Sequence, residues 1–278
     1  MPQKTVLITG CSSGIGLKTA KLFQEKGWNV AATMRTPSKE KFPDTEKNVL
    51  ILELDVTKPE TIKTAIDATI KKFGRIDVIV NNAGYAVTGP FELASEEQIQ
   101  RQFDTNVYGP MRVIQAILPH FREKKSGTII NISSMGGRMT FPLYSLYHST
   151  KWAIEGFTEG LQYELEEFGI TLKLIEPESI RTDFYTRSAD KIDGKKLGPY
   201  KNFYEGTMQQ IMTSGQYGLK PKKVAQVIFK AATSRSKKFR YQVGFRSFAL
   251  LFLKRILPHR LYYIMVRDAM VIRKNKKT

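Results

Sequence analysis

Three side chains in the stretch 134–151 have the types and spacing needed for acid–base chemistry: Ser134, Tyr147 and Lys151. Tyr147 and Lys151 are four residues apart, so on a helix they lie on one face, one turn from each other. A phenol with its ordinary pKa of about 10 is almost wholly protonated at neutral pH, and a neighbouring ammonium lowers that pKa. Such a phenol can act as a general acid–base catalyst, with Ser134 binding a substrate oxygen from the opposite side. The same spacing also fits an exposed tyrosine beside a solvated lysine, so the surrounding elements must decide.

A glycine-rich turn near the N-terminus predicts a dinucleotide site. It follows a short apolar run at 5–9 and precedes a segment with helical periodicity that stops at Gly27. Gly10 allows a tight turn, and Gly14 and Gly16 let a pyrophosphate and the strand approach the N-terminus of the helix, where free amides and the helix dipole favour an anion. The alternative is a glycine-rich turn that binds nothing, since the spacing G-x-x-x-G-x-G departs from the commoner G-x-G-x-x-G. The candidate cofactor residues in the turn are Gly10, Ser12, Ser13, Gly14, Ile15 and Gly16.

The end of the second apolar run, residues 28–33, bears on which cofactor is bound. In dinucleotide sites an acid at this place holds the ribose 2′-hydroxyl, whereas an arginine nearby accommodates a 2′-phosphate. Here Met34 stands where the acid would be and Arg35 follows it, with Ser12 and Ser13 as further hydroxyl donors. This pattern favours NADP(H) and leaves NAD(H) possible. The alternative is that Arg35 is an ordinary loop arginine.

The rest of the chain alternates apolar runs with helical segments, which predicts a parallel sheet covered on both faces. We expect a Rossmann-like α/β fold, a doubly wound parallel seven-stranded sheet in a three-layer αβα arrangement. Ligands bind at the carboxyl ends of the strands in such sheets, where Asn82, Ala83, Gly84 and Ser134 fall. The predicted later strands are 49–54, 76–80, 127–132, 170–177 and 239–243, and the predicted later helices are 59–73, 96–122, a segment ending near 168, and 221–233.

Asn106 lies inside the predicted helix 96–122. An asparagine in a helix usually faces solvent or caps a break, because its side chain competes for backbone hydrogen bonds. The alternative is that Asn106 holds a water and locally widens the helix.

Size and composition fit one large domain in a reducing compartment. The chain has 278 residues, 41% of them hydrophobic, and a single cysteine, Cys11, so an internal disulfide framework is excluded. No apolar run is long enough to span a bilayer, and the N-terminus lacks the features of a signal peptide. We therefore expect a cytoplasmic protein. No metal site is expected.

The net charge of +18 is concentrated at the C-terminus. Residues 235–278 hold thirteen of the 44 Lys and Arg residues and one of the 26 acids, Asp268. No nucleic-acid motif accompanies this charge, so we expect no nucleic-acid partner. Basic amphipathic segments can lie on anionic membrane surfaces, so peripheral membrane contact through the tail is possible. The alternative is a helix pair that packs its apolar face on the domain and points its arginines outward.

We expect a catalytic domain at 1–246, with a substrate lid at 183–220, and a basic amphipathic extension at 247–278. Long insertions between core elements are usually functional lids or mobile loops. The apolar residues of the lid either wall a pocket or face the core on two helices. They are Phe184, Tyr185, Phe203, Tyr204, Met208 and Met212.

Taken together, these motifs resemble the short-chain dehydrogenase/reductase family over nearly the whole chain. The matching features are TGCSSGIG at 9–16, Asp55, NNAG at 81–84, Asn106, Ser134, Tyr147, Lys151 and Thr182. TGCSSGIG, Met34-Arg35 and SMGGRM look most similar to the hydroxysteroid and retinol dehydrogenase branch. The resemblance implies that members often form homo-oligomers.

The resemblance also implies a role for each matching residue. Tyr147 would be the general acid–base catalyst, Lys151 would lower its pKa and bind the nicotinamide ribose, Ser134 would bind the substrate carbonyl, and Asn106 would hold a proton-relay water. Asp55 and Val56 would contact adenine, and Asn82, Ala83 and Gly84 the ribose side. Pro177, Ile180 and Thr182 would contact the nicotinamide end of the cofactor. Glu178 departs from the family's usual glycine, and Tyr144 is a decoy whose i+4 partner is His148.

The expected activity is hydride transfer between NADP(H) and a carbonyl or secondary alcohol, small and lipophilic like a steroid, retinoid or ketone. The alternatives are an NAD-dependent alcohol dehydrogenase, or a cofactor-binding protein that is catalytically idle and docks on membranes.

Overall fold

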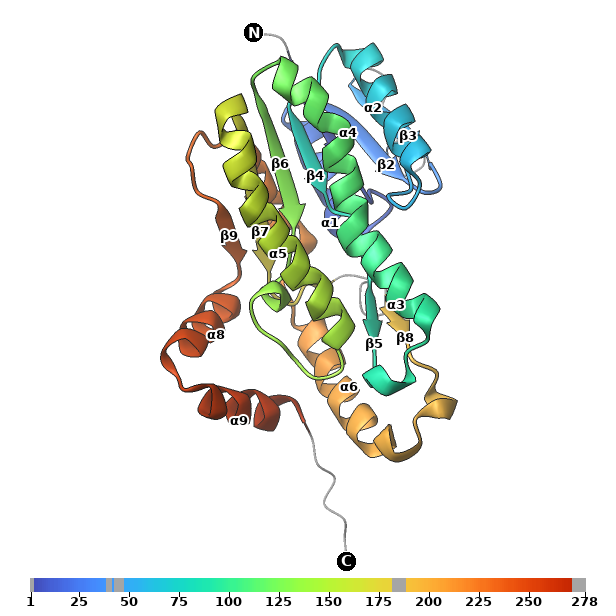
Figure 1. Ribbon diagram of the computed structural model, residues 1–278, viewed down its shortest axis with the longest axis vertical. Helices are drawn as coiled ribbons and strands as arrows, with labels where there is room; N and C mark the ends of the chain where they lie inside the picture. The colour runs from blue at the N-terminus through green and yellow to red at the C-terminus, as the bar shows by residue number, and fades with distance from the viewer. Residues whose placement is uncertain (1–2, 39–41, 43–47, 182–188, 272–278) are drawn as a thin grey trace, which may run out of the picture.

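Seven parallel strands form the centre of the protein (Figure 1). The computed structural model describes residues 3–38, 42, 48–181 and 189–271. The strands are β1 (Thr5–Ile8), β2 (Asn29–Met34), β3 (Val49–Glu53), β4 (Val78–Asn81), β6 (Gly127–Ile132), β7 (Ile170–Pro177) and β9 (Arg240–Val243). Their order in space is β3-β2-β1-β4-β6-β7-β9, and every neighbouring pair is parallel. The seven-stranded parallel sheet predicted from the sequence is thus confirmed.

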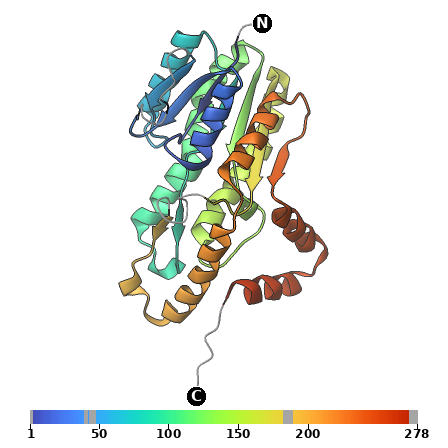
Figure 2. The ribbon, with the colours of Figure 1, turned by 180° about the vertical axis from the view of Figure 1, so that it is seen from behind.

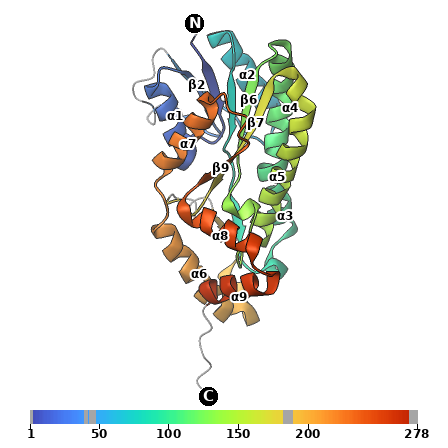
Figure 3. The same ribbon diagram turned by 90° about the vertical axis from the view of Figure 1, so that its left-hand side faces the viewer.

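Helices cover both faces of the sheet, as Figure 3 shows in side view. On one face lie α1 (Gly14–Glu25) and α7 (Pro221–Thr233), which pack against each other and are in front in Figure 2. On the other face lie α2 (Pro59–Phe73), α4 (Gly109–Glu123) and α5 (Ser145–Leu165). Side chains alternate along each strand, so β1 sends Val6 and Ile8 into the α1–α7 core and Leu7 into the opposite core. The result is the three-layer arrangement expected from the sequence.

The order of the strands places the candidate site. Chain order reverses between β1 and β4, and in doubly wound sheets the crevice beyond the strand ends at such a point holds the ligand. The glycine-rich turn follows β1, and residues 82–84 follow β4. The sheet therefore brings the two motifs together.

The predicted helix 96–122 is three elements, so the prediction of one continuous helix was wrong. They are α3 (Glu96–Phe103), a π-helical turn (Asp104–Tyr108) and α4. α3 starts at a capping box, in which the Ser95 hydroxyl accepts from the amide of Gln98 and the Gln98 side chain accepts from the amide of Ser95. The π-turn adds a residue to one helical turn and so changes which side chains face inward.

A two-stranded sheet that the sequence analysis missed lies beyond the strand ends. It pairs β5 (Ala86–Thr88) with β8 (Ala189–Lys191), and α6 (Lys201–Gln216) follows β8 after two short turns. Strands of three residues are too short to give a periodic signal.

The C-terminal part forms two helices, α8 (Phe245–Ile256) and α9 (His259–Met270), which extend from the β9 edge (Figures 1 and 3). Ser247 and Tyr262 are buried against the rest of the protein, but four large apolar side chains of α8 are exposed. The expected helix pair is observed, but its apolar residues do not all pack on the domain. Among the residues that the structure describes, no helix combines the length and apolarity needed to cross a bilayer.

Candidate active site

One cleft, about 1280 Å³ in volume, opens at the carboxyl ends of the strands. It is lined by the turn after β1, the ends of β2 and β3, the loops after β4, β6 and β7, and the start of α5. The sequence-predicted residues that line it are Gly10, Ser12, Ser13, Gly14, Ile15, Arg35, Asp55, Val56, Asn82, Ala83, Gly84, Ser134, Tyr147, Lys151, Pro177 and Ile180. Gly16 and Asn106 are not among the lining residues, and Thr182 lies outside the described residues.

Thr9 and Asn82 hold the glycine-rich turn against the loop after β4. The Thr9 hydroxyl accepts from the amides of Asn82 and Ala83 at 3.0 Å each, and Asn82 Nδ2 donates to the carbonyls of Thr9 and Gly10 at 2.9 and 3.1 Å. Gly10 has φ +72°, and a side chain on Gly16 would overlap the Gly10 carbonyl. Gly16 therefore acts by close packing behind the turn. The turn forms a compact cradle at the N-terminus of α1, which suits a pyrophosphate.

Two further predicted residues, Arg35 and Asp55, line the cleft next to the ends of β2 and β3. Arg35 is exposed at the end of β2. Asp55 is fixed because its Oδ1 accepts from the amide and the hydroxyl of Thr57, at 3.0 and 2.8 Å. A guanidinium at this edge can reach an anionic substituent on a bound ribose.

Ser134 is placed at the end of β6 with its hydroxyl hydrogen available. Its Oγ accepts from the amide of Gly136 at 3.0 Å, so the hydroxyl proton can be donated to a ligand. His148 holds the following loop, because its Nε2 accepts from the amide of Phe141 at 2.9 Å and its Nδ1 donates to the carbonyl of Gly136 at 3.0 Å. Burial lowers the pKa of His148 to about 4, so this imidazole is neutral in its bridging role. The spacing of residues alone marks His148 only as the i+4 partner of Tyr144 and does not predict this bridging role.

Tyr147 and Lys151 lie on one face of α5, as their spacing predicts. The Lys151 ammonium is 5.7 Å from the centre of the Tyr147 ring and donates to the carbonyl of Ile132 at 2.8 Å. Lys151 is buried and Tyr147 half-buried, so the solvated-lysine alternative is wrong. Burial lowers the pKa of Lys151 to about 8 and Glu155 opposes that shift, which leaves the side chain mostly charged at neutral pH.

Asn106 is buried at the π-helical turn, so the expectation that it faces solvent was wrong. Its Oδ1 accepts from the amide of Tyr85 at 3.1 Å, and its Nδ2 donates to the Tyr85 carbonyl at 2.9 Å and to the Thr150 hydroxyl at 3.1 Å. The widened helix is confirmed. Asn106 thus ties the loop after β4 to α5 one residue before Lys151. Its role in holding a relay water stays a prediction.

An acidic pair lies behind Lys151. Glu155, one turn further along α5, and Glu176 on β7 are both buried, and the guanidinium of Arg240 is 3.2 Å from Glu155 and 3.6 Å from Glu176. Burial and the charge of Glu176 raise the pKa of Glu155 to about 7. The arginine partners Arg240 and Arg138 oppose the shift without cancelling it.

The raised pKa predicts a pH-dependent stability. Glu155 has an ordinary pKa of 4.5, so between pH 4.5 and about 7 the folded protein binds more protons than the unfolded chain. Its contribution is present below pH 4.5 and is lost as the pH rises through about 7. We expect the unfolding free energy of the wild type, relative to Glu155→Gln, to fall by as much as about 3 kcal/mol between about pH 5 and about pH 8.

Chemical denaturation at both pH values measures this difference. Glu159→Gln is the control, because Glu159 pairs with the same guanidinium at 2.7 Å but is 55% exposed. An equal pH trend for wild type and Glu155→Gln would contradict the prediction.

Glu178, the departure from the family pattern, has a structural partner in the C-terminal helices. Its Oε2 accepts from the amide of Ser247 in the first turn of α8 at 3.3 Å, where a carboxylate also suits the helix dipole. A side chain on Gly244, which has φ +115°, would overlap this carboxylate. Glu178 thus joins the loop after β7 to α8, a contact that spacing in the sequence could not reveal.

The cleft is also lined by residues that sequence reasoning mostly missed. They are Tyr85, Met135, Phe141, Tyr144, Ile211, Ser214, Leu250 and Met270. Among the predicted lid residues, Tyr204 and Met208 pack against a buried cluster of Ala86, Leu143, Tyr144 and Ile211. Phe203 is 36% exposed. Phe184 and Tyr185 lie outside the described residues. Tyr204 and Met208 thus fit the core-facing alternative, and Ile211 takes the lining position.

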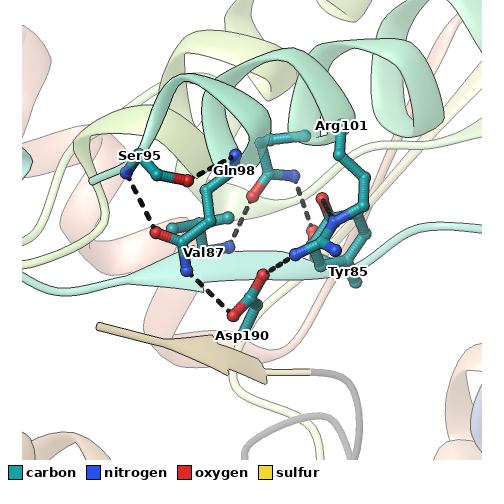
Figure 4. Close-up of polar contacts among 7 residues, drawn as sticks. Tyr85, Val87, Ser95, Gln98, Arg101 and Asp190 are labelled. Carbon is teal, nitrogen blue, oxygen red and sulfur yellow. Dashed lines mark hydrogen bonds and ion pairs between the residues drawn. The ribbon is translucent and has the colours of Figure 1, made fainter. Parts of the chain in front are cut away.

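Polar contacts fasten the small sheet to α3 at this end of the cleft (Figure 4). Asp190 on β8 accepts from the Gln98 side chain at 3.0 Å and pairs with Arg101. Arg101 Nε also donates to the Tyr85 hydroxyl at 3.2 Å. Residues more than 80 positions apart in the chain thus hold β8 over the cleft.

The chain matches the family model of short chain dehydrogenases over residues 4–193. It is 43% identical over 211 residues to an uncharacterized oxidoreductase of Schizosaccharomyces pombe, covering 76% of this chain and 88% of the relative. It is 35% identical over 245 residues to a 3-ketodihydrosphingosine reductase of Bacteroides thetaiotaomicron, covering 88% of this chain and 89% of the relative. It is 30% identical to human retinol dehydrogenase 8 over an alignment of 287 residues, covering 97% of this chain and 91% of the relative.

Solved structures show the same fold. A short-chain dehydrogenase from Streptomyces avermitilis superposes with a TM-score of 0.79 at 31% identity, covering 96% of each chain. ElxO, solved with NADP bound, superposes with a TM-score of 0.72 at 30% identity, covering 88% of this chain and 99% of ElxO.

Proposed function

The chain belongs to the short-chain dehydrogenase family, and we propose that it transfers hydride between NADP(H) and the carbonyl or secondary alcohol of a lipophilic small molecule. The observation that carries the proposal is the juxtaposition of Tyr147 with a buried Lys151 ammonium in a cleft that also holds a glycine-rich cradle. A non-enzyme would have no need of this arrangement, which argues against an idle cofactor-binding protein.

The nicotinamide cofactor, when bound, supplies or accepts the hydride. The glycine-rich turn would hold its pyrophosphate, Asp55 and Val56 its adenine, and Pro177 and Ile180 its nicotinamide end. The residues present fit that group, since the cleft joins the glycine-rich N-terminus of α1 to the Tyr147–Lys151 pair.

The chain's own residues would then manage the proton. Ser134 donates a hydrogen bond to the substrate oxygen and orients it. Tyr147 delivers its phenolic proton to that oxygen during reduction, and takes one from the alcohol during oxidation. The Lys151 ammonium stabilises the phenolate left behind, because the opposite charge lies within one helical turn in a poorly solvated site.

NADP(H) is the preferred cofactor in this proposal because Met34 ends β2 where NAD-binding sites carry an acid, and Arg35 follows it on the edge of the cleft. ElxO, with NADP bound, supports a phosphorylated cofactor. An NAD-dependent alcohol dehydrogenase is the alternative.

Arg35→Ala should weaken NADPH binding about 10- to 100-fold, because a charge-assisted hydrogen bond contributes about 1.5–3 kcal/mol. NADH binding should change less than about threefold, since NADH has no 2′-phosphate. Fluorescence titration with both cofactors measures the two dissociation constants. Arg122→Ala, an exposed arginine on α4, is the control. Equal losses for both cofactors would contradict the phosphate contact.

The substrate is proposed to be lipophilic because the lining of the cleft includes Met135, Phe141, Ile211, Leu250 and Met270. Two relatives carry the names of lipophilic substrates, 3-ketodihydrosphingosine and retinol, which supports this choice. The test is a carbonyl panel from small ketones to steroids and retinoids, read by loss of NADPH absorbance. If the protein reduced none of these carbonyls, the proposed reaction would be contradicted.

We also propose that the protein works in the cytoplasm as a homo-oligomer, with residues 183–220 acting as a substrate lid on the domain at 1–246. Light scattering of the purified protein measures the oligomeric state. If the protein were a monomer at micromolar concentration, the proposed homo-oligomer would be contradicted.

A further inference from the structure

Helix α8 has an inner face that is anchored to the protein. Ser247 is fully buried, and its amide donates to Glu178. Lys254 donates to the carbonyl of Arg138, and its ammonium lies 4.7 Å from the centre of the Trp152 ring. Leu250 lines the cleft. These contacts fix the rotation of α8 and so decide which side chains it turns outward.

The outer face of α8 is a row of large apolar side chains, which we call the α8 stripe. It consists of Phe245, Phe248, Phe252 and Ile256, whose exposed fractions are 81%, 58%, 54% and 56%. Spacings of three and four residues place all four on one side of the helix. Single exposed apolar residues are ordinary on a protein surface, but a contiguous row points to an interaction site.

Two exposed arginines lie near the C-terminal end of the stripe. Arg255, next to Ile256, and Arg260, at the start of α9, are both exposed. Residues 272–278, which lie outside the described residues, include Arg273, Lys274, Lys276 and Lys277. Asp268 is the one acid in 235–278, and it pairs with Arg267. The partner of this surface should therefore offer an apolar layer next to negative charge.

We propose that the α8 stripe lies on the surface of an anionic lipid bilayer, with its aromatic rings at the boundary between headgroups and acyl chains. Phenylalanines on one helix face with arginines beside them match the acyl and headgroup layers of such a membrane. A second copy of this chain fits less well, because a two-fold contact through the stripe would bring the two basic surfaces together. No membrane-crossing helix is needed, since α8 would lie in the plane of the interface.

The docked orientation would bring the cleft close to the lipid. The inner side of α8 contributes Leu250 to the cleft, and α9 contributes Met270. A lipophilic substrate could then pass between bilayer and cleft without crossing much water. This consequence rests on the proposed function, whereas the docking surface itself does not.

Co-sedimentation of the full-length protein with vesicles tests the docking. We expect binding to phosphatidylcholine vesicles that contain phosphatidylserine, little binding to phosphatidylcholine alone, and weaker binding at high salt. Phe248→Ser with Phe252→Ser should weaken binding at least tenfold, because two rings no longer enter the lipid. Arg255→Gln with Arg260→Gln should weaken it roughly 25-fold at low salt, since each basic residue near an anionic surface contributes about fivefold.

Matched controls remove the same groups elsewhere on the surface. Tyr163→Ser with Phe91→Ser removes rings that are 75% and 59% exposed, and Lys195→Gln with Lys196→Gln removes two exposed charges. Both controls should bind vesicles as the wild type does. Thermal melting and NADPH titration check that the phenylalanine variant is folded, and the arginine variant provides a test independent of it.

Three results would overturn the proposal. The first is that the wild type does not bind phosphatidylserine vesicles. The second is that the phenylalanine and arginine double variants bind these vesicles as the wild type does. The third is that light scattering shows a dimer that dissociates when the phenylalanines are replaced. The last result would identify a second copy as the occupant. None of these readouts involves turnover, so failure of the docking and failure of the proposed reaction are distinguishable.

Discussion

Tyr147→Phe is expected to lower the turnover of a carbonyl substrate about a thousandfold, because a positioned general acid–base group typically contributes 10²- to 10⁴-fold. The substitution removes only the phenolic oxygen. The ring that packs 5.8 Å from the rings of Tyr144 and His148 remains, so the shape of α5 and the cleft should not change. NADPH binding should stay within about threefold of the wild type. Single-turnover absorbance measurements with saturating NADPH give the rate of the chemical step.

Tyr144→Phe is the matched control for this experiment. Tyr144 lines the same cleft and is buried, but no lysine follows it one helical turn later. We expect that variant to keep turnover within about tenfold of the wild type. The assignment of Tyr147 as the proton donor would be refuted if Tyr147→Phe turned over the carbonyl substrate as fast as the wild type. It would also be refuted if Tyr147→Phe and Tyr144→Phe lost equal turnover.

Lys151→Met is expected to lower turnover about a hundredfold or more, because it removes the ammonium that stabilises the Tyr147 phenolate. Methionine keeps much of the length of the buried side chain, so the loss of packing is small. If the ammonium acts by lowering the pKa of the phenol, the residual activity should also need a higher pH for alcohol oxidation. Initial rates across pH in the oxidative direction measure that displacement.

Lys173→Met controls for the removal of a buried lysine. Lys173 on β7 is as buried as Lys151, lies 5.7 Å from the centre of the Tyr241 ring, and donates to the carbonyls of Ala231 and Ser234 at 2.7 and 2.9 Å. It does not line the cleft. Lys173→Met should therefore lower stability while the turnover of the folded protein stays close to the wild type. A normal pH profile for Lys151→Met would show that Lys151 has only a structural role.

The two lysines show why a Tyr–Lys pair in a sequence needs its surroundings to be interpreted. Both ammonium groups are buried and lie near a phenol, yet only the pair at the start of α5 faces the cleft. The sequence favoured Tyr147 and Lys151 because they follow a strand that ends in Ser134, within a regular alternation of strands and helices. The roles assigned to the site residues, and the preference for NADP(H), stay predictions that the proposed variants test.

The central sheet, the helices on its two faces and the edge of the sheet that carries the cleft could be predicted from the amino-acid sequence. These features follow from local rules, since strand alternation, helical spacing and the freedom of Gly10 at positive φ act within a few residues. The spacing of four residues likewise placed Tyr147 and Lys151 together without knowledge of any distant contact. The same rules predicted one helix over 96–122, because nothing in its periodicity marks a π-turn.

The groups that support the site could be identified only from the three-dimensional structure. Asn106 is buried because Tyr85 and Thr150 satisfy its amide. Glu155 on α5 has a raised pKa because it is buried and because Glu176 on β7 lies close to it. Glu178 is accommodated because Gly244, 66 positions later, leaves room for its carboxylate at the start of α8. The exposure of the α8 stripe likewise depends on which face of that helix the domain covers. Each feature depends on partners far apart in the chain, and burial, charge and hydrogen bonding act through space rather than along the sequence.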